Sequence, residues 1–222
     1  MTNQTIRKHV VISGTGRAGT SFLVQLLTKL GLETGFTEQT MTLNQNARAG
    51  LEWDVRKENA PYIVKSPYFC DHAEEVVQRN DIVIEHVFIP VRDLQAAAES
   101  RRFVVESAIS KLPLWQKLKG KIKPPKVPGG LFNTRRKSKQ EDVLLLEFHK
   151  LMLALSSAQI PVTLLQYPKL VRDSAYLYKK LSPILGAISY EQFLTACKQT
   201  VRPDWVHSFS SAESSSPPAS SL

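Results

Sequence analysis

The chain has few cysteines and no long apolar run. Only Cys70 and Cys197 occur among its 222 residues, and they stand far apart, without the spacing of a metal-binding motif. We therefore expect neither a disulfide framework nor a zinc site. Nowhere do the roughly 18 consecutive apolar residues that span a bilayer occur, and the first residues lack an apolar run of signal-peptide length. These absences predict a cytoplasmic protein without a transmembrane segment.

Acidic residues are missing from one stretch of the chain. Ten Lys or Arg and no Asp or Glu lie between 107 and 140, whereas the formal net charge of the whole chain is +9, so the other residues sum to −1. A basic surface is typical of nucleic-acid binding, but this segment lacks an aromatic-rich surface that would stack on bases. We expect no specific nucleic acid as a partner. Residues 111–139, rich in Lys, Pro and Gly, are predicted to be a flexible basic insertion.

The remaining composition indicates a single globular domain. Hydrophobic side chains make up 42% of the chain and charged ones 22%, which suffices for an ordinary core. Short β-branched runs alternate with longer stretches of helical periodicity, a pattern typical of a parallel sheet covered by helices. We predict a three-layer α/β domain over residues 1–205. The Ser- and Pro-rich tail, 206–222, is expected to be disordered.

Apolar periodicity and breaker residues locate the elements of this domain. The predicted strands are 9–13, 62–65, 82–91 and 161–166. The predicted helices are 22–30, 94–105, 141–157, 173–185 and 190–200. A long polar connection, 33–59, separates the first helix from the second strand, and connections of this length are more often functional than idle. We expect this connection to contact a substrate.

A glycine-rich loop joins the first strand to the first helix. Its sequence is Gly14-Thr15-Gly16-Arg17-Ala18-Gly19-Thr20-Ser21. Glycines between a strand and a helix let backbone N–H groups and the helix N-terminus face an anion, so the loop predicts a P-loop-like phosphate site. In nucleotide triphosphatases a Lys follows the second of two glycines five positions apart. Thr20 stands at that position, and Arg17 within the loop supplies the positive charge instead.

A magnesium-dependent enzyme of this class also needs an acidic residue at the end of a neighbouring strand. Asp93 is the one candidate, and Arg92 beside it favours a phosphate ligand over a cation. A small-molecule or nucleotide kinase using ATP and magnesium is therefore the first alternative, and a non-enzymatic nucleic-acid-binding protein is the second.

Arg92 and Ser100 stand eight positions apart, one at a strand end and one on the following helix. With the glycine loop, this pair resembles the nucleotide site of sulfotransferases, which bind 3′-phosphoadenosine 5′-phosphosulfate through a glycine loop and an Arg and Ser at this separation. The loop is similar to that of bacterial and carbohydrate sulfotransferases. Two further segments, 65–69 (Lys-Ser-Pro-Tyr-Phe) and 167–173, resemble the family in the same order.

The resemblance implies roles for individual residues. The loop from Gly14 to Ser21 would hold the 5′ end of the donor, and Arg92 and Ser100 would bind its 3′-phosphate. Arg17 and Lys65 would neutralise the departing 5′-phosphate in an in-line sulfuryl transfer that needs no metal ion.

The base, the basic element that covers the nucleotide and the acceptor each have more than one candidate. Glu38, in the long connection, is our choice for the general base that takes the acceptor proton, with Glu33, Glu52, Asp54 and His72 as competitors. The basic element that covers the nucleotide in the family has two candidates, 135–137 or Lys198 with Arg202. The acceptor is a small molecule, a lipid or a glycan, bearing a hydroxyl or an amine.

Overall fold

The computed structural model describes residues 6–14, 16–41, 50–112 and 127–201. Within them a parallel sheet of four strands has the order β2-β1-β3-β4. The strands are β1 (Arg7–Ile12), β2 (Ile63–Lys65), β3 (Ile82–Val91) and β4 (Val162–Gln166). Because all four run in the same direction, their carboxyl ends meet at one edge of the sheet.

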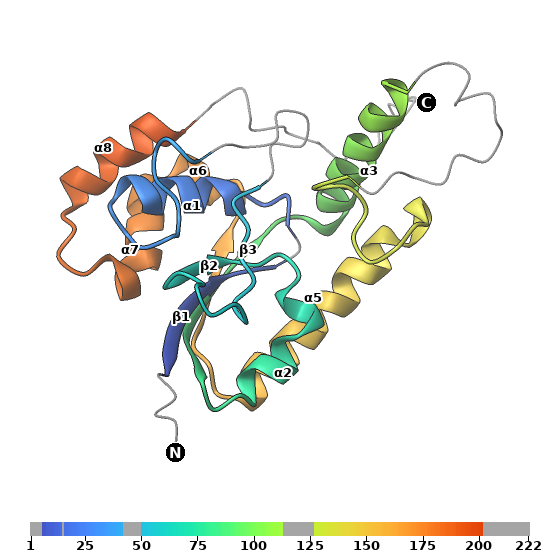
Figure 1. Ribbon diagram of the computed structural model, residues 1–222. Coiled ribbons are helices and arrows are strands. Elements are labelled where there is room, and N and C mark those ends of the chain that lie inside the picture. Colours follow the sequence, from blue (N-terminus) through green and yellow to red (C-terminus); the bar gives the residue numbers. More distant parts are fainter. Residues whose placement is uncertain (1–5, 15, 42–49, 113–126, 202–222) are drawn as a thin grey trace, which may run out of the picture.

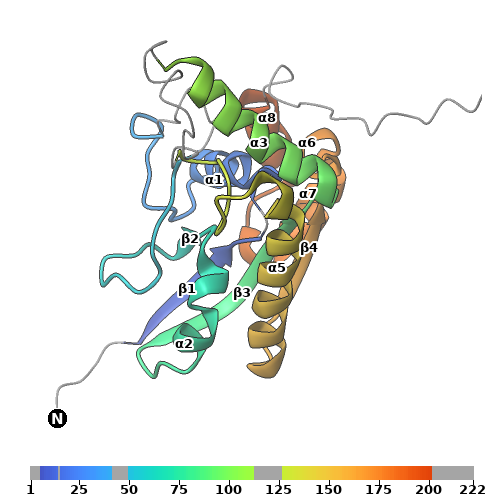
Figure 2. The same ribbon diagram turned by 90° about the vertical axis from the view of Figure 1, so that its right-hand side faces the viewer.

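Helices cover both faces of the sheet, as Figures 1 and 2 show. The described helices of eight or more residues are α1 (Thr20–Lys29), α3 (Leu94–Ser110), α5 (Gln140–Ser157), α7 (Ser174–Leu185) and α8 (Tyr190–Thr200). The shorter ones are η1 (Phe69–Asp71), α2 (Ala73–Val77), η2 (Lys137–Lys139) and α6 (Lys169–Arg172).

Two apolar cores lie between the sheet and the helices, one on each face of the sheet. Alternate residues of a strand point to opposite faces, so in β1 Val10 and Ile12 pack with α1, α7 and α8, whereas Val11 packs with α2 and α5. All three side chains are fully buried. A strand buried on both faces is what an α/β architecture with helices on each side requires. The chain is thus a three-layer α/β domain, as the alternation in the sequence predicts.

The predicted element positions agree with the structure to within a few residues, apart from the C-terminal end of α3. The strand predicted at 82–91 has the bounds of β3, and the helix predicted at 94–105 continues to Ser110 as α3. The sequence did not predict the short helices η1, α2, η2 and α6.

The predicted basic insertion, 111–139, lies partly outside the described residues. The part that is described, 127–139, packs against α3: Phe132 is buried, Gly130 O accepts from Arg101, and Lys137 O accepts from Arg102 Nε at 3.0 Å. This portion of the insertion is therefore held to the domain. The tail predicted at 206–222 lies outside the described residues.

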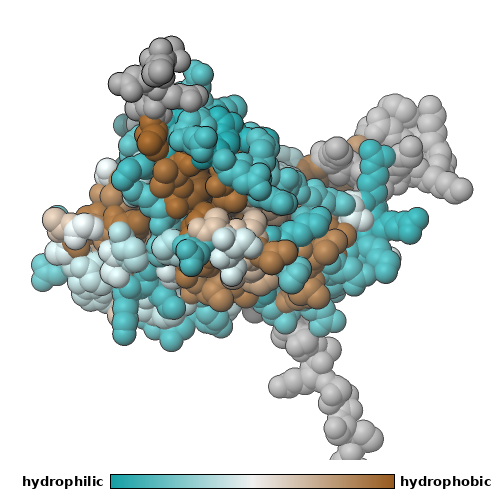
Figure 3. Space-filling model, turned by 90° about the horizontal axis from the view of Figure 1, so that it is seen from below, coloured by the Kyte–Doolittle hydropathy of each residue, from teal (hydrophilic) through white to brown (hydrophobic). Residues whose placement is uncertain are grey.

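The lower side of the molecule, opposite the carboxyl edge of the sheet, has a mixed surface. Figure 3 shows brown, apolar areas there between teal, polar ones. Among the described residues, no helix has both the length and the apolar character that crossing a bilayer requires. The side chains with candidate chemistry gather at the other edge of the sheet.

Candidate anion-binding site

The described part of the glycine loop contains four residues with positive φ. Gly14, Gly16, Arg17 and Gly19 have φ values of 122°, 66°, 56° and 87°. Residues with positive φ interspersed in a loop turn successive N–H groups toward one concave side, as in backbone nests that bind anions. Arg17 is not glycine, and a side chain held in the left-handed region marks a conformation that the surroundings impose.

Helix α1 begins directly after this loop. Its N-cap, Gly19, has no side chain to accept from the first turn, which contains no acidic residue. The first N–H groups of a helix lack intrahelical acceptors, and the helix dipole adds positive potential there. Ala18 and Thr20 are buried. In an anion site these two residues would contribute backbone N–H groups, while Thr15 lies outside the described residues.

The residues predicted to bind the 3′-phosphate lie beside the loop. Arg17 Nε donates to Ser100 Oγ at 3.1 Å, across 83 residues of sequence. Arg92 Nη1 donates to the Arg17 carbonyl at 3.0 Å, and its guanidinium lies over the Tyr167 ring at 4.9 Å from the centroid. Tyr167 directly follows β4. The carboxyl ends of β1, β3 and β4 therefore meet at these contacts.

Arg101 is a component of the site to which the sequence assigned no role. It is 4% exposed, Nη1 donates to Gly130 O at 2.7 Å, and its guanidinium lies over the Phe132 ring at 5.0 Å. Burial, and then the nearby charge of Arg17, lower its pKa to about 10. An anion bound between Arg17 and Arg101 would relieve this repulsion.

Gly16 makes room for Arg101. A Cβ added at Gly16 would lie 2.5 Å from Arg101 Nη2, so the buried guanidinium sits directly against the loop backbone. At Gly19 an added Cβ would meet Leu170 at 3.1 Å, which shows that the segment after β4 packs against the loop as well.

Lys65, at the end of β2, also reaches the loop. Its Nζ donates to Ser21 Oγ at 2.9 Å and to the Gly50 carbonyl, and it lies 3.5 Å from Glu52 Oε1. The side chain is 3% exposed, and burial lowers the pKa of its amine. The second strand therefore ends beside the loop: β2 pairs with β1, with Lys65 opposite Ile12.

Two of the four carboxylates considered for the general base, Glu38 and Glu52, lie in different places. Glu38 is exposed and accepts from Lys29 Nζ at 3.3 Å, at the last residue of α1. Ten helical residues put that end about 13 Å from the loop, so the structure does not bring Glu38 to Arg17 or Lys65. Glu52 lies at Lys65 because the Trp53 N–H donates to the Lys65 carbonyl at 2.9 Å.

Asp93, the only candidate for a strand-end magnesium ligand, has another role. Its carboxylate caps α3 by accepting from Ala96 N at 2.8 Å. Ser21, at the position of the magnesium-binding hydroxyl in triphosphatases, accepts from Lys65 instead. The two groups that would hold magnesium are therefore both engaged in other contacts.

The candidates for covering the nucleotide lie in separate parts of the chain. Lys137 pairs with Glu106 on α3 at 2.8 Å, Lys198 is exposed on α8, and Arg202 lies outside the described residues.

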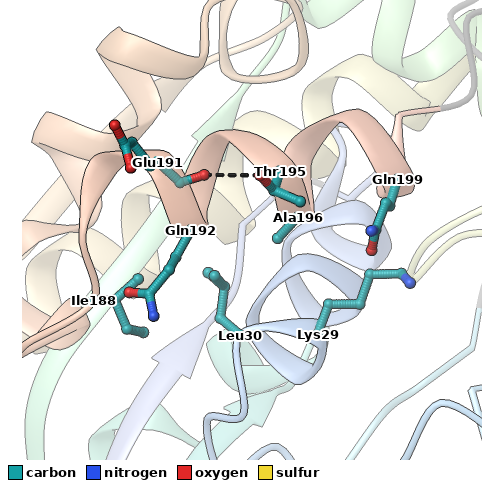
Figure 4. A pocket seen from close by; sticks show the side chains of 8 residues that line it. All are labelled: Lys29, Leu30, Ile188, Glu191, Gln192, Thr195, Ala196 and Gln199. Carbon is teal, nitrogen blue, oxygen red and sulfur yellow. Dashed lines mark hydrogen bonds between the residues drawn. The ribbon is translucent and has the colours of Figure 1, made fainter.

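A cavity of about 450 Å³ lies at the opposite end of α1 (Figure 4). Its lining comes from the C-terminal end of α1 and from α8 with the residue that precedes its N-cap: Lys29, Leu30, Ile188, Glu191, Gln192, Thr195, Ala196 and Gln199. Of the residues predicted to bind nucleotide or take part in catalysis, none lines it.

Comparison with known proteins adds no relative. No protein-family profile, no curated protein and no solved structure matches the chain.

Proposed function

We propose that the chain is a sulfotransferase. It binds 3′-phosphoadenosine 5′-phosphosulfate in a P-loop-like site and transfers the sulfuryl group to an acceptor. The observation that carries the proposal is the pair of contacts linking Arg17 to Ser100 and Arg92 to the Arg17 carbonyl. Arg92 and Ser100 thus meet Arg17, 75 and 83 residues away in sequence, at the N-terminus of one helix, where an anion is favoured. The spacing that resembles the family thus coincides with a spatial cluster.

In this proposal the loop N–H groups and Arg17 bind the 5′-phosphate, and Arg92 and Ser100 select the 3′-phosphate. Charge-assisted hydrogen bonds from arginine suit phosphate oxygens because the guanidinium presents several donors in one plane. Arg101 acts through its neighbours: packed against Gly16 and held by Gly130, it fixes the loop and adds positive potential. We assign it a positioning role.

Transfer then needs neutralisation of the leaving group and removal of one proton. The acceptor oxygen forms a bond to sulfur, the bond from sulfur to the 5′-phosphate oxygen breaks, and its electron pair stays on the phosphate beside Arg17 and Lys65. Of the carboxylates weighed from sequence, we now propose Glu52 as the base that takes the acceptor proton, because it lies at Lys65 whereas Glu38 pairs with Lys29. The acceptor is a hydroxyl or amine on a small molecule, lipid or glycan.

Ligand-induced thermal stabilisation tests the nucleotide assignment. We expect 3′-phosphoadenosine 5′-phosphate without metal to raise the melting temperature more than ATP with magnesium does. Arg92→Ala should weaken binding of the 3′-phosphorylated nucleotide about 10- to 100-fold, since a hydrogen bond to a charged group contributes about 1.5–3 kcal/mol. ATP binding should change less, because ATP lacks the 3′-phosphate.

Arg79→Ala is the matched control. It removes the same charge from a residue that pairs with Asp81 at 2.7 Å, just before β3, at the opposite edge of the sheet. A preference for ATP, a requirement for magnesium, or equal losses in the two variants would overturn the proposal and favour a kinase or a non-specific anion site.

A further inference from the structure

Three potential metal ligands meet on the α2 and α5 face of the sheet, from two segments that are distant in sequence. Cys70 and Asp71 belong to η1, and Glu147 belongs to α5. One ligand atom of each lies within 4.8 Å of the corresponding atom of the others. None of the three is among the residues assigned to the nucleotide site.

Glu147 supplies an independent indication that something charged belongs here. The residue is 8% exposed, and its Oε2 is buried with no hydrogen-bond partner among the described residues. Its other oxygen, Oε1, accepts from Lys150 Nζ at 3.3 Å. A buried carboxylate oxygen that is left without a partner costs free energy, so native structures satisfy such atoms with a donor or a cation.

Two of the three ligand atoms are spaced nearly as they would be around a bound ion. Tetrahedral zinc, with bonds of about 2.3 Å to sulfur and about 2.1 Å to oxygen, places its ligand atoms about 3.4–3.6 Å apart. Cys70 Sγ lies 3.9 Å from Asp71 Oδ1, a difference of a few tenths of an ångström. All three ligand atoms lie within 4.8 Å of one another, so binding an ion would draw them closer together.

A neighbouring side chain orients one of the ligands. Asp71 Oδ1 accepts from Asn133 Nδ2 at 2.7 Å, a hydrogen bond of the kind that orients metal-bound carboxylates. Asn133 follows Phe132, whose ring stacks on Tyr68 with centroids 5.0 Å apart. An ion here would join η1 and α5 and support the segment that carries Phe132.

We propose that Cys70, Asp71 and Glu147 bind a divalent ion of the zinc class. A thiolate with two carboxylates suits borderline ions such as Zn²⁺, Co²⁺ and Cd²⁺ better than Mg²⁺ or Ca²⁺, which require oxygen ligands. On binding, the Cys70 thiol releases its proton to solvent as the sulfur–metal bond forms. Three protein ligands leave one tetrahedral position for water.

Metal titration of the untagged, chelator-treated full chain tests this site. We expect one Zn²⁺ per chain, measured by competition with a chromophoric chelator, and a sulfur-to-metal charge-transfer band when Co²⁺ is bound instead. Cys70→Ser should abolish the band. Glu147→Gln should lower the zinc affinity by more than about tenfold, since even outer partners of metal ligands contribute 10- to 100-fold.

The other cysteine gives a matched control. Cys197 is buried on α8 and does not belong to the cluster of potential ligands. Cys197→Ser should therefore keep both the stoichiometry and the band. Zinc should also protect Cys70 from alkylation in the Cys197→Ser background, a readout that requires no change at Glu147. Absence of zinc binding, a band that survives Cys70→Ser, or alkylation that zinc leaves unchanged would overturn the proposal.

Discussion

The two ends of α1 offer different kinds of candidate site. Its C-terminal end borders a cavity of about 450 Å³ lined largely by polar side chains and by the Lys29 that pairs with Glu38. Its N-terminal end carries the glycine loop, where Arg17, Arg101 and Lys65 converge. A concave surface and a concentration of positive charge therefore lie at different ends of the same helix. Charge at a helix N-terminus, and not volume, identifies the candidate site for a phosphorylated ligand.

The difference arises from the topology of the sheet. At the N-terminal end of α1, the carboxyl ends of all four strands lie close together, so side chains from separate segments meet. At the C-terminal end the neighbours are α8 and the start of the long connection, which bring the Lys29–Glu38 ion pair, Glu191 and neutral polar groups. A parallel sheet concentrates chemistry on one edge in this way.

The two glutamates give the largest expected contrast between the ends. Glu52→Gln should lower turnover by about 10²- to 10⁴-fold, the usual contribution of a general base, and leave nucleotide binding intact. Glu38→Gln should change turnover little, because it removes only an exposed ion pair with Lys29. Sulfuryl transfer from a radiolabelled donor to pooled hydroxyl and amine acceptors measures both.

The reverse outcome would contradict the assignment of Glu52 as the base. If Glu38→Gln abolished turnover while Glu52→Gln did not, the long connection would have to move Glu38 to the loop on acceptor binding.

Glycines with positive φ at each end give a smaller contrast. Gly16 and Gly31 have φ values of 66° and 77°, so replacing either with Ala should cost about 1–2 kcal/mol of folding stability. Only at Gly16 does the new Cβ meet Arg101, while at Gly31 nothing lies within 4 Å. We expect Gly16→Ala to weaken 3′-phosphoadenosine 5′-phosphate binding about tenfold, equivalent to roughly one charge-assisted hydrogen bond. Gly31→Ala should leave the affinity unchanged.

Isothermal titration calorimetry, with thermal melts for stability, measures the two effects separately. Equal losses of affinity in the two variants would show that global destabilisation, and not contact with Arg101, is responsible.

The smallest expected effect concerns the cavity. Thr195→Leu should fill part of the cavity. The substitution should change nucleotide affinity by less than about twofold, because the cavity lies at the far end of α1 from Arg17. A loss as large as that of Gly16→Ala, measured in the same titrations, would place the nucleotide in the cavity and contradict the assignment to the loop.

The sequence predicts the sheet and the loop well because each has a local signature. The ten residues of β3 are continuously apolar or β-branched apart from Glu85, His86 and Pro90, and their bounds were predicted without error. The meeting of Arg92, Ser100 and the loop follows from strand order in a parallel sheet. Helix α2 has no such signature: its five residues are too few for a periodic pattern, and burial of Ala73 and Val76 stabilises it.

The sequence could not choose the carboxylate or assign a role to Arg101. Glu33, Glu38 and Glu52 all stand in an aperiodic connection, and the one that returns to the loop is set by the backbone bond from Trp53 to Lys65 and by burial of Leu51. Arginine is usually exposed, so a buried Arg101 is invisible to composition. Its partners at Gly130 and Phe132 lie in a segment whose basic composition suggested a flexible insertion.

The central position of β1 has a consequence for folding. The strand that carries the loop pairs with β2 and with β3, whose residues lie 50 or more positions later in the chain. Such non-local pairing forms late because chain entropy opposes it until the intervening segments have collapsed. No fragment that ends before α3 contains Ser100, so a nascent or truncated chain can hold helices and paired strands while it still lacks the residues that would recognise the nucleotide.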